Sequence, residues 1–192
     1  MMAAMMLPSA LPMIRLHRLG ADDAAGPWRR EARSALFVVG YLLVWAASGV
    51  VVWVAGRLAA AVVPMEARSV AVAAVLLAAG VYQLTPLKAT CLRACRTPMD
   101  FLLTHWYRGA AGTLRLGVEH GLYCLGCCWA LMAVFVVAGS MSLVWAVAIA
   151  AVVAVEKLAP RGPLLGRLLG VGLLAAAAAV LFRPELAGTM GH

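Results

Sequence analysis

Residues 35–63 read ALFVVGYLLVWAASGVVVWVAGRLAAAVV, with Arg57 as the only charged side chain. A helix that crosses a bilayer needs about 20 predominantly apolar residues, so this run predicts a full membrane span. Four further apolar runs predict spans at 69–85, 116–138, 141–155 and 164–182. The predicted fold class is therefore all-α: a polytopic transmembrane helix bundle of about five full spans, forming a single transmembrane domain over residues 1–192.

The composition of the whole chain supports this class. Of its 192 residues, 65% are hydrophobic and 12% are charged, and the mean hydropathy is +0.94. A soluble domain is closer to half apolar and a quarter charged, and a chain of this size keeps too much surface in water to hide the excess. Composition therefore excludes a soluble globular enzyme and a disordered chain.

The first residues, MMAAMMLPSALPM (1–13), are apolar but too short to cross a bilayer. We expect Pro8 and Pro12 to end any helix there, because proline removes a backbone donor and crowds the preceding turn. The segment predicts a partial N-terminal helix, followed by a polar linker over residues 14–34.

Basic residues predict the topology. Residues 14–34, 86–115 and 156–167 hold thirteen of the sixteen Lys and Arg side chains, and the opposite side holds three. Cytoplasmic loops of membrane proteins carry such an excess, so all three basic segments are predicted to be cytoplasmic. The net charge of +8 then reflects a multi-pass protein of the bacterial inner (cell) membrane, with the lipid bilayer and not nucleic acid as its partner.

All five cysteines lie between residues 91 and 128, and three of them fall in the run HGLYCLGCCW at 120–129. Residues three and four apart share one face of a helix, so an imidazole and two or three thiols point the same way. Thiolate and imidazole suit a soft metal, copper first and zinc second. The predicted metal ligands are Cys91, Cys95, His120, Cys124, Cys127 and Cys128.

Other polar and soft side chains give weaker signals. Met1, Met2, Met5 and Met6 could present thioethers to Cu(I), although methionine on an apolar helix ordinarily serves packing. Glu119 and Glu156 lie near span ends, where we expect each to pair with an interfacial Lys or Arg such as Lys157. His17 belongs to no recognisable pattern.

Several spaced motifs resemble a known family. The runs YQLTPLKATCLRACRTP and LGVEHGLYCLGCCWALM, with Glu156–Lys157 and the N-terminal MMLPSALPM, are similar to the bacterial family of predicted metal-binding integral membrane proteins, whose function is unknown. The resemblance implies a multi-span inner-membrane protein with a metal site formed by the six residues above. Family members usually have more hydrophobic sequence before MMLPS, so the chain is expected to begin inside that hydrophobic element.

These observations predict a membrane protein that binds a soft metal ion for handling, delivery or transport, with a metal donor or acceptor protein as its partner. No G-x-x-x-x-G-K-[ST] run is present, so a primary pump acting alone is not expected. The alternative is an enzyme: a membrane thiol–disulfide oxidoreductase using the Cys124/Cys127 and Cys91/Cys95 pairs. The predicted cytoplasmic side argues against it. A scaffold with incidental thiols is a third possibility.

Overall fold

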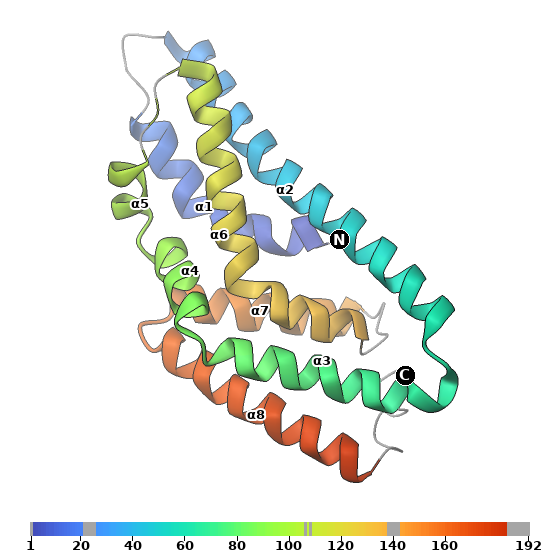
Figure 1. Cartoon of the computed structure of the whole chain (residues 1–192). Coiled ribbons are helices and arrows are strands. Elements are labelled where there is room, and N and C mark those ends of the chain that lie inside the picture. Colours follow the sequence, from blue (N-terminus) through green and yellow to red (C-terminus); the bar gives the residue numbers. More distant parts are fainter. Residues whose placement is uncertain (1, 21–25, 106, 108, 138–142, 184–192) are drawn as a thin grey trace. The chain divides into compact units, whose positions relative to one another are not determined.

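The computed structural model describes every residue except 1, 21–25, 106, 108, 138–142 and 184–192 (Figure 1). The described ranges are helical and contain no strand, which confirms the all-α prediction. The chain forms two compact units, Met1–Val50 with Thr90–Cys127 (unit 1) and Val51–Ala89 with Cys128–His192 (unit 2). The elements are α1 (Met2–Gly20), α2 (Gly26–Val62), a 3-10 turn (Met65–Ala67), α3 (Arg68–Gln83), α4 (Pro86–Arg96), α5 (Pro98–Thr104), α6 (Gly109–Val137), α7 (Leu143–Leu158) and α8 (Gly162–Phe182).

Within the described ranges, three helices are long and apolar enough to cross a membrane: Trp28–Val62, Gly109–Val136 and Gly162–Phe182. The pair α3 and α4 would make a fourth span, bent by 64° at its break. The five spans predicted from sequence are therefore not all shown, because α3 and α7 are helices of 16 residues each. The predicted span ends at residues 138 and 141 lie outside the described residues.

The prediction that prolines end the N-terminal helix is wrong, since α1 continues through Pro8 and Pro12 as a helix of 19 residues. Both prolines are exposed, whereas the opposite face of α1 is buried. Each proline removes one helical hydrogen bond, and burial of the apolar face offsets that loss. The linker is also shorter than the predicted range 14–34, because α1 reaches Gly20 and α2 begins at Gly26.

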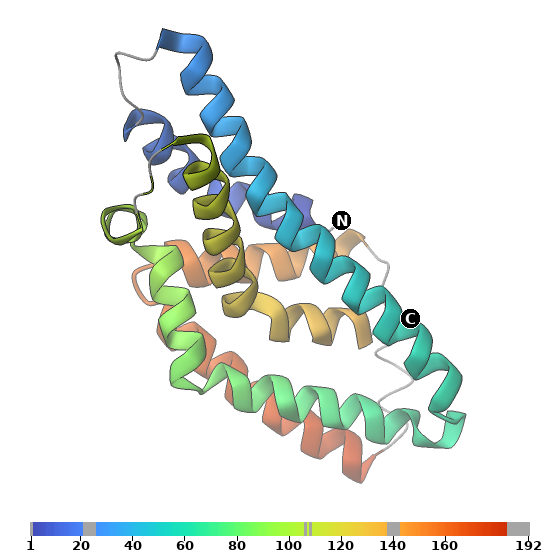
Figure 2. The ribbon, with the colours of Figure 1, turned by 45° about the horizontal axis from the view of Figure 1, so that its top comes forward.

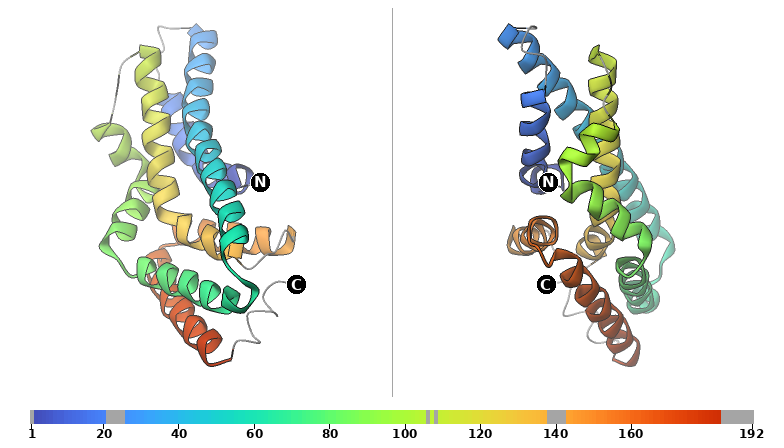
Figure 3. Two further views of the ribbon diagram at one scale, coloured as in Figure 1. Left: turned by 45° about the vertical axis from the view of Figure 1, so that its right-hand side comes forward. Right: turned by 90° about the vertical axis from the view of Figure 1, so that its left-hand side faces the viewer.

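Unit 1 depends on a close approach between α2 and α6, which run beside each other in Figures 2 and 3. A Cβ atom built on Gly117 would lie 2.2 Å from the backbone oxygen of Phe37, and one built on Gly40 would lie 2.4 Å from that of Leu114. These two glycines let the helix backbones touch directly. The sequence analysis had not paired them, because no spacing rule links residues 40 and 117.

Unit 2 is built on α3 and α8, which lie side by side (Figures 1 and 3). Gly80 and Gly170 face each other across this contact, since a Cβ on either one would come within about 3 Å of the other's backbone oxygen. A small apolar core continues the contact through Ala73, Leu76 and Ala177.

A buried ion pair also lies in unit 2. Lys88 Nζ contacts Glu156 Oε1 at 3.0 Å and Oε2 at 2.8 Å, and both side chains are almost fully buried. Gly166 of α8 lies against this carboxylate and leaves room for it. Glu156 thus pairs with a basic residue, as expected, but one that lies 68 positions away in the sequence and that the sequence analysis had not named. Glu119 follows the prediction, because Arg115 Nε donates to its Oε1 at 2.8 Å.

The contact between α2 and α6 can be tested with one methyl group. Gly117→Ala forces the two backbones apart, and overpacking of this kind typically lowers the free energy of unfolding by about 1–3 kcal/mol. Gly49→Ala in α2 is the matched control, because nothing lies within 4 Å of its Cβ position, and it should leave stability unchanged or slightly raised. The measurement is thermal unfolding of the purified protein in detergent. Equal stability of the two variants would contradict the packing described here.

Candidate metal site

The motif HGLYCLGCCW forms one continuous stretch of α6, as predicted. His120 is 3% exposed, and Cys124, Cys127 and Cys128 are each 1% exposed. Because α6 is helical here, His120 and Cys124 lie one turn apart on the same face, with Cys127 next along it. An imidazole and at least two thiols are thus withdrawn from water together.

Aromatic rings surround His120. Its ring centroid lies 5.9 Å from that of Phe37 and 6.0 Å from that of Tyr41, both on α2, and 5.4 Å from that of Phe101 on α5. Phe101 meets the imidazole edge to face. Aromatic rings from two helices, α2 and α5, therefore make up much of the surroundings of His120.

Cys124 is joined to α2 through Tyr41. The hydroxyl of Tyr41 and the sulfur of Cys124 form a hydrogen bond of 3.1 Å, and both residues are buried. The same tyrosine ring contacts His120, so Tyr41 touches both candidate ligands of α6. Sequence reasoning missed Tyr41, and its spacing four residues after Phe37 on an apolar helix gives no functional signal.

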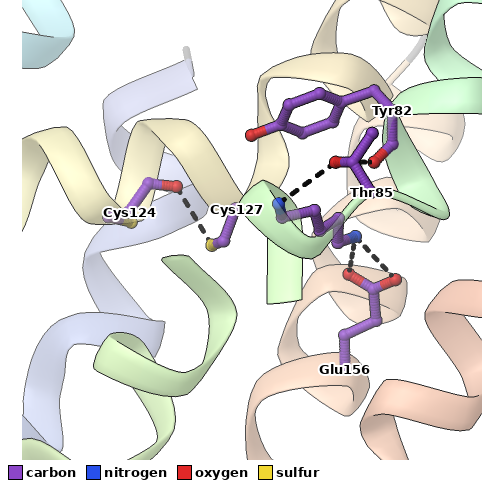
Figure 4. A network of polar contacts seen from close by, with 6 residues as sticks. Tyr82, Thr85, Cys124, Cys127 and Glu156 are labelled. Carbon is purple, nitrogen blue, oxygen red and sulfur yellow. Dashed lines mark hydrogen bonds and ion pairs between the residues drawn. The ribbon is translucent and has the colours of Figure 1, made fainter. Parts of the chain in front are cut away.

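Cys127 is held by its own helix. Its sulfur donates a hydrogen bond of 3.1 Å to the backbone oxygen of Cys124, as Figure 4 shows. The separate group of sticks in Figure 4 belongs to unit 2, where the Thr85 hydroxyl oxygen accepts from the backbone N–H of Lys88 at the start of α4, and Lys88 pairs with Glu156.

The second cysteine pair lies on α4. Cys91 and Cys95 are four residues apart on this helix, and both are partly buried. Among the residues whose placement is described, no three His, Cys, Asp or Glu side chains gather in an arrangement that could hold a metal ion. The joint site of all six predicted ligands therefore stays a prediction.

His17 of α1 is a second buried imidazole that sequence reasoning missed. Its ring stacks on Phe37, with centroids 5.3 Å apart. Burial lowers the pKa of His17 below its ordinary value, and repulsion from Arg33 adds to the effect. The neutral form, which has a lone pair available to a metal, is thereby favoured.

The described helices thus bury sulfur and imidazole donors in an otherwise apolar, all-helical protein. A family model described as PpoB2, copper chaperone, matches residues 1–180, and the chain belongs to this family. The family match supports copper handling and gives no support for zinc. No match was found among curated proteins or among solved structures.

Tyr41 offers a test of the site that leaves the candidate ligands in place. Tyr41→Phe keeps the ring beside His120 and removes the hydroxyl bonded to Cys124. Loss of such an outer contact typically weakens metal binding about 10–100-fold, so Cu(I) affinity, measured by competition with a chromophoric chelator, should fall by about tenfold. Tyr123→Phe, on α6 but against Phe101, is the control and should bind as the wild type does. Equal affinities for the two variants would remove Tyr41 from the site.

Proposed function

We propose that this protein is a membrane-embedded copper chaperone that binds Cu(I) at His120 and Cys124 and passes it to an acceptor protein. One observation carries the proposal: two soft donors, one helical turn apart and buried, both contact Tyr41. Cys127, Cys128, Cys91 and Cys95 complete the proposed set of donors. The membership of the chain in a copper chaperone family supports copper as the cargo.

The geometry favours Cu(I) over zinc. A structural zinc site is almost always closed by four ligands in a tetrahedron, whereas the pair that carries this proposal offers one imidazole and one thiol. Cu(I) prefers soft thiolate and thioether ligands and is satisfied by fewer of them. An imidazole and a thiol on adjacent turns suit an ion that must be bound and then released.

Charge balance explains how copper enters so apolar a site. A protonated thiol in the empty site carries no charge and needs no counter-ion. When Cu(I) binds, the sulfur of Cys124 releases its proton and forms a bond with the metal. The positive charge of the bound copper then replaces the positive charge of the released proton. The net charge of the site is unchanged, and the large penalty for burying an isolated ion does not arise.

The proposal is tested by copper content. Cys124→Ser with His120→Phe removes both donors and keeps a ring among the aromatic neighbours, so copper bound per chain should fall from about one to near zero. Protein purified under reducing conditions, without nickel resin, would be analysed by mass spectrometry of metals after incubation with Cu(I). Cys91→Ser with Cys95→Ser is the matched comparison, and its loss of copper measures what α4 contributes. Wild-type protein with no more copper than the Cys124/His120 variant would refute the proposal.

We further propose that the chain crosses the cell membrane five times, in α2, α3, α6, α7 and α8. The three long apolar helices support this arrangement. At 1.5 Å per residue, α3 and α7 are each about 24 Å long, a little short of the ~30 Å hydrocarbon core. Local thinning of the bilayer accommodates such a mismatch, and the basic segments then all face the cytoplasm.

Labelling of introduced cysteines tests this topology. Glu66 and Arg161 are both exposed and lie in the connections before α3 and α8. In intact cells an impermeant maleimide should label Glu66→Cys above the wild-type level, whereas Arg161→Cys should gain label only after lysis. If only Arg161→Cys is labelled in intact cells, the proposed orientation is reversed. If both variants are labelled in intact cells, the chain crosses the membrane an even number of times between residues 66 and 161, which contradicts the crossings proposed in α3, α6 and α7.

A further inference from the structure

The buried face of α1 is unusually rich in soft donors. Among the side chains of α1 that the structure describes, the buried ones are Met6 (0% exposed), Ala10 (1%), Met13 (2%) and His17 (4%), at spacings of four, three and four residues. Two thioethers and an imidazole therefore form one stripe along the helix.

Apolar packing alone does not explain this choice of residues. α1 also contains Leu11 and Leu19, which would serve a hydrophobic interface better, yet they are 44% and 75% exposed. Burying an imidazole in their place is unfavourable unless it gains an interaction. The helix thus buries two methionines and a histidine while Leu11 and Leu19 lie on its exposed side, and Ile14 and Leu16 pack beside the buried stripe.

The stripe meets the aromatic surroundings of His120. Met13 packs in one cluster with Phe37, Phe101 and Leu116. The rings of Phe37 and Phe101 are the same two that contact His120. Met13 and His120, from helices far apart in the sequence, therefore share two aromatic neighbours.

His17 extends the same arrangement. It stacks on Phe37, which also contacts His120. Phe37 is fully buried, so both imidazoles lie in the interior of unit 1, against a single ring. No anionic side chain is part of this cluster as described, and its donors are neutral ones that suit Cu(I).

We infer that α1 supplies a second Cu(I)-binding position, formed by Met13 and His17, from which copper exchanges with His120 and Cys124. The inference rests on the proposed function and adds ligands to it. Met6, two turns before Met13 on the same buried face, extends the soft surface along α1. Binding at Met13 and His17 forms bonds from sulfur and nitrogen lone pairs to the ion, and no proton is released and no electron is transferred.

The test uses two near-isosteric substitutions in the full chain. Met13→Leu removes the sulfur and keeps the packing volume, and His17→Phe keeps the ring stacked on Phe37 and removes the nitrogens. In chelator competition we expect the wild type to take up a second, weaker equivalent of Cu(I) after the first, and the double variant to bind this second equivalent at least about tenfold more weakly, with its thermal unfolding little changed. Met99→Leu, at an exposed methionine of α5, is the control and should bind as the wild type does.

A spectroscopic measurement reports on Met13 directly. In protein labelled with ¹³C at the methionine methyl groups, the Met13 signal is assigned by its loss in Met13→Leu. Addition of a second equivalent of Ag(I), a diamagnetic ion with the ligand preference of Cu(I), should shift the Met13 signal and leave the Met99 signal in place.

The outcomes separate the two proposals. If the wild type binds neither Cu(I) nor Ag(I), the proposed function fails and this inference falls with it. If the wild type binds, the Cys124/His120 variant does not, and the double variant of α1 binds normally with an unmoved Met13 signal, then only the inference on α1 is refuted.

Discussion

The direct backbone contact between α2 and α6 determines the geometry of unit 1. Gly117 meets the backbone of Phe37, and Gly40 meets that of Leu114. Tyr41 follows Gly40, and His120 and Cys124 follow Gly117 by one and two turns. Because each helix is regular, bringing the glycines together also brings Phe37 and Tyr41 against His120, and the Tyr41 hydroxyl to the sulfur of Cys124. A larger residue at either glycine would separate the helices and change every one of these contacts.

Periodicity along the chain was enough to predict the helix through HGLYCLGCCW and the common face of its donors, because both depend only on residues within a few turns. It could not predict contacts made by tertiary packing. The partner of Glu156 is Lys88, 68 positions away. The continuation of α1 through Pro8 and Pro12 depends on the burial of its other face, and the interior position of His17 depends on Phe37. In each case, an interaction between distant segments determined the outcome, and rules based on neighbouring residues could not predict it.

The two units stabilise buried polar groups by different means. In unit 2, Lys88 and Glu156 are a pair of opposite charges that compensate each other. Removing one of them would leave the other as a buried charge without compensation, which is strongly destabilising. In unit 1, the thiols and imidazoles at the candidate site can all be neutral, so each can be buried without a fixed counter-ion. A site of neutral donors remains able to accept a cation, whereas a closed ion pair already has its charge satisfied.

The ligand types proposed for α1 and α6 differ in the charge they leave on copper. At Met13 and His17 the ligands are neutral, so the bound ion keeps its full positive charge in surroundings of low polarity, where an uncompensated charge is unfavourable. At Cys124 the departing proton carries that charge away. Copper should therefore bind weakly and reversibly on the α1 side and rest beside Cys124, and the difference should grow with pH because proton release becomes easier. A chaperone with this order of affinities can take up its cargo through thioether and imidazole ligands without holding it there.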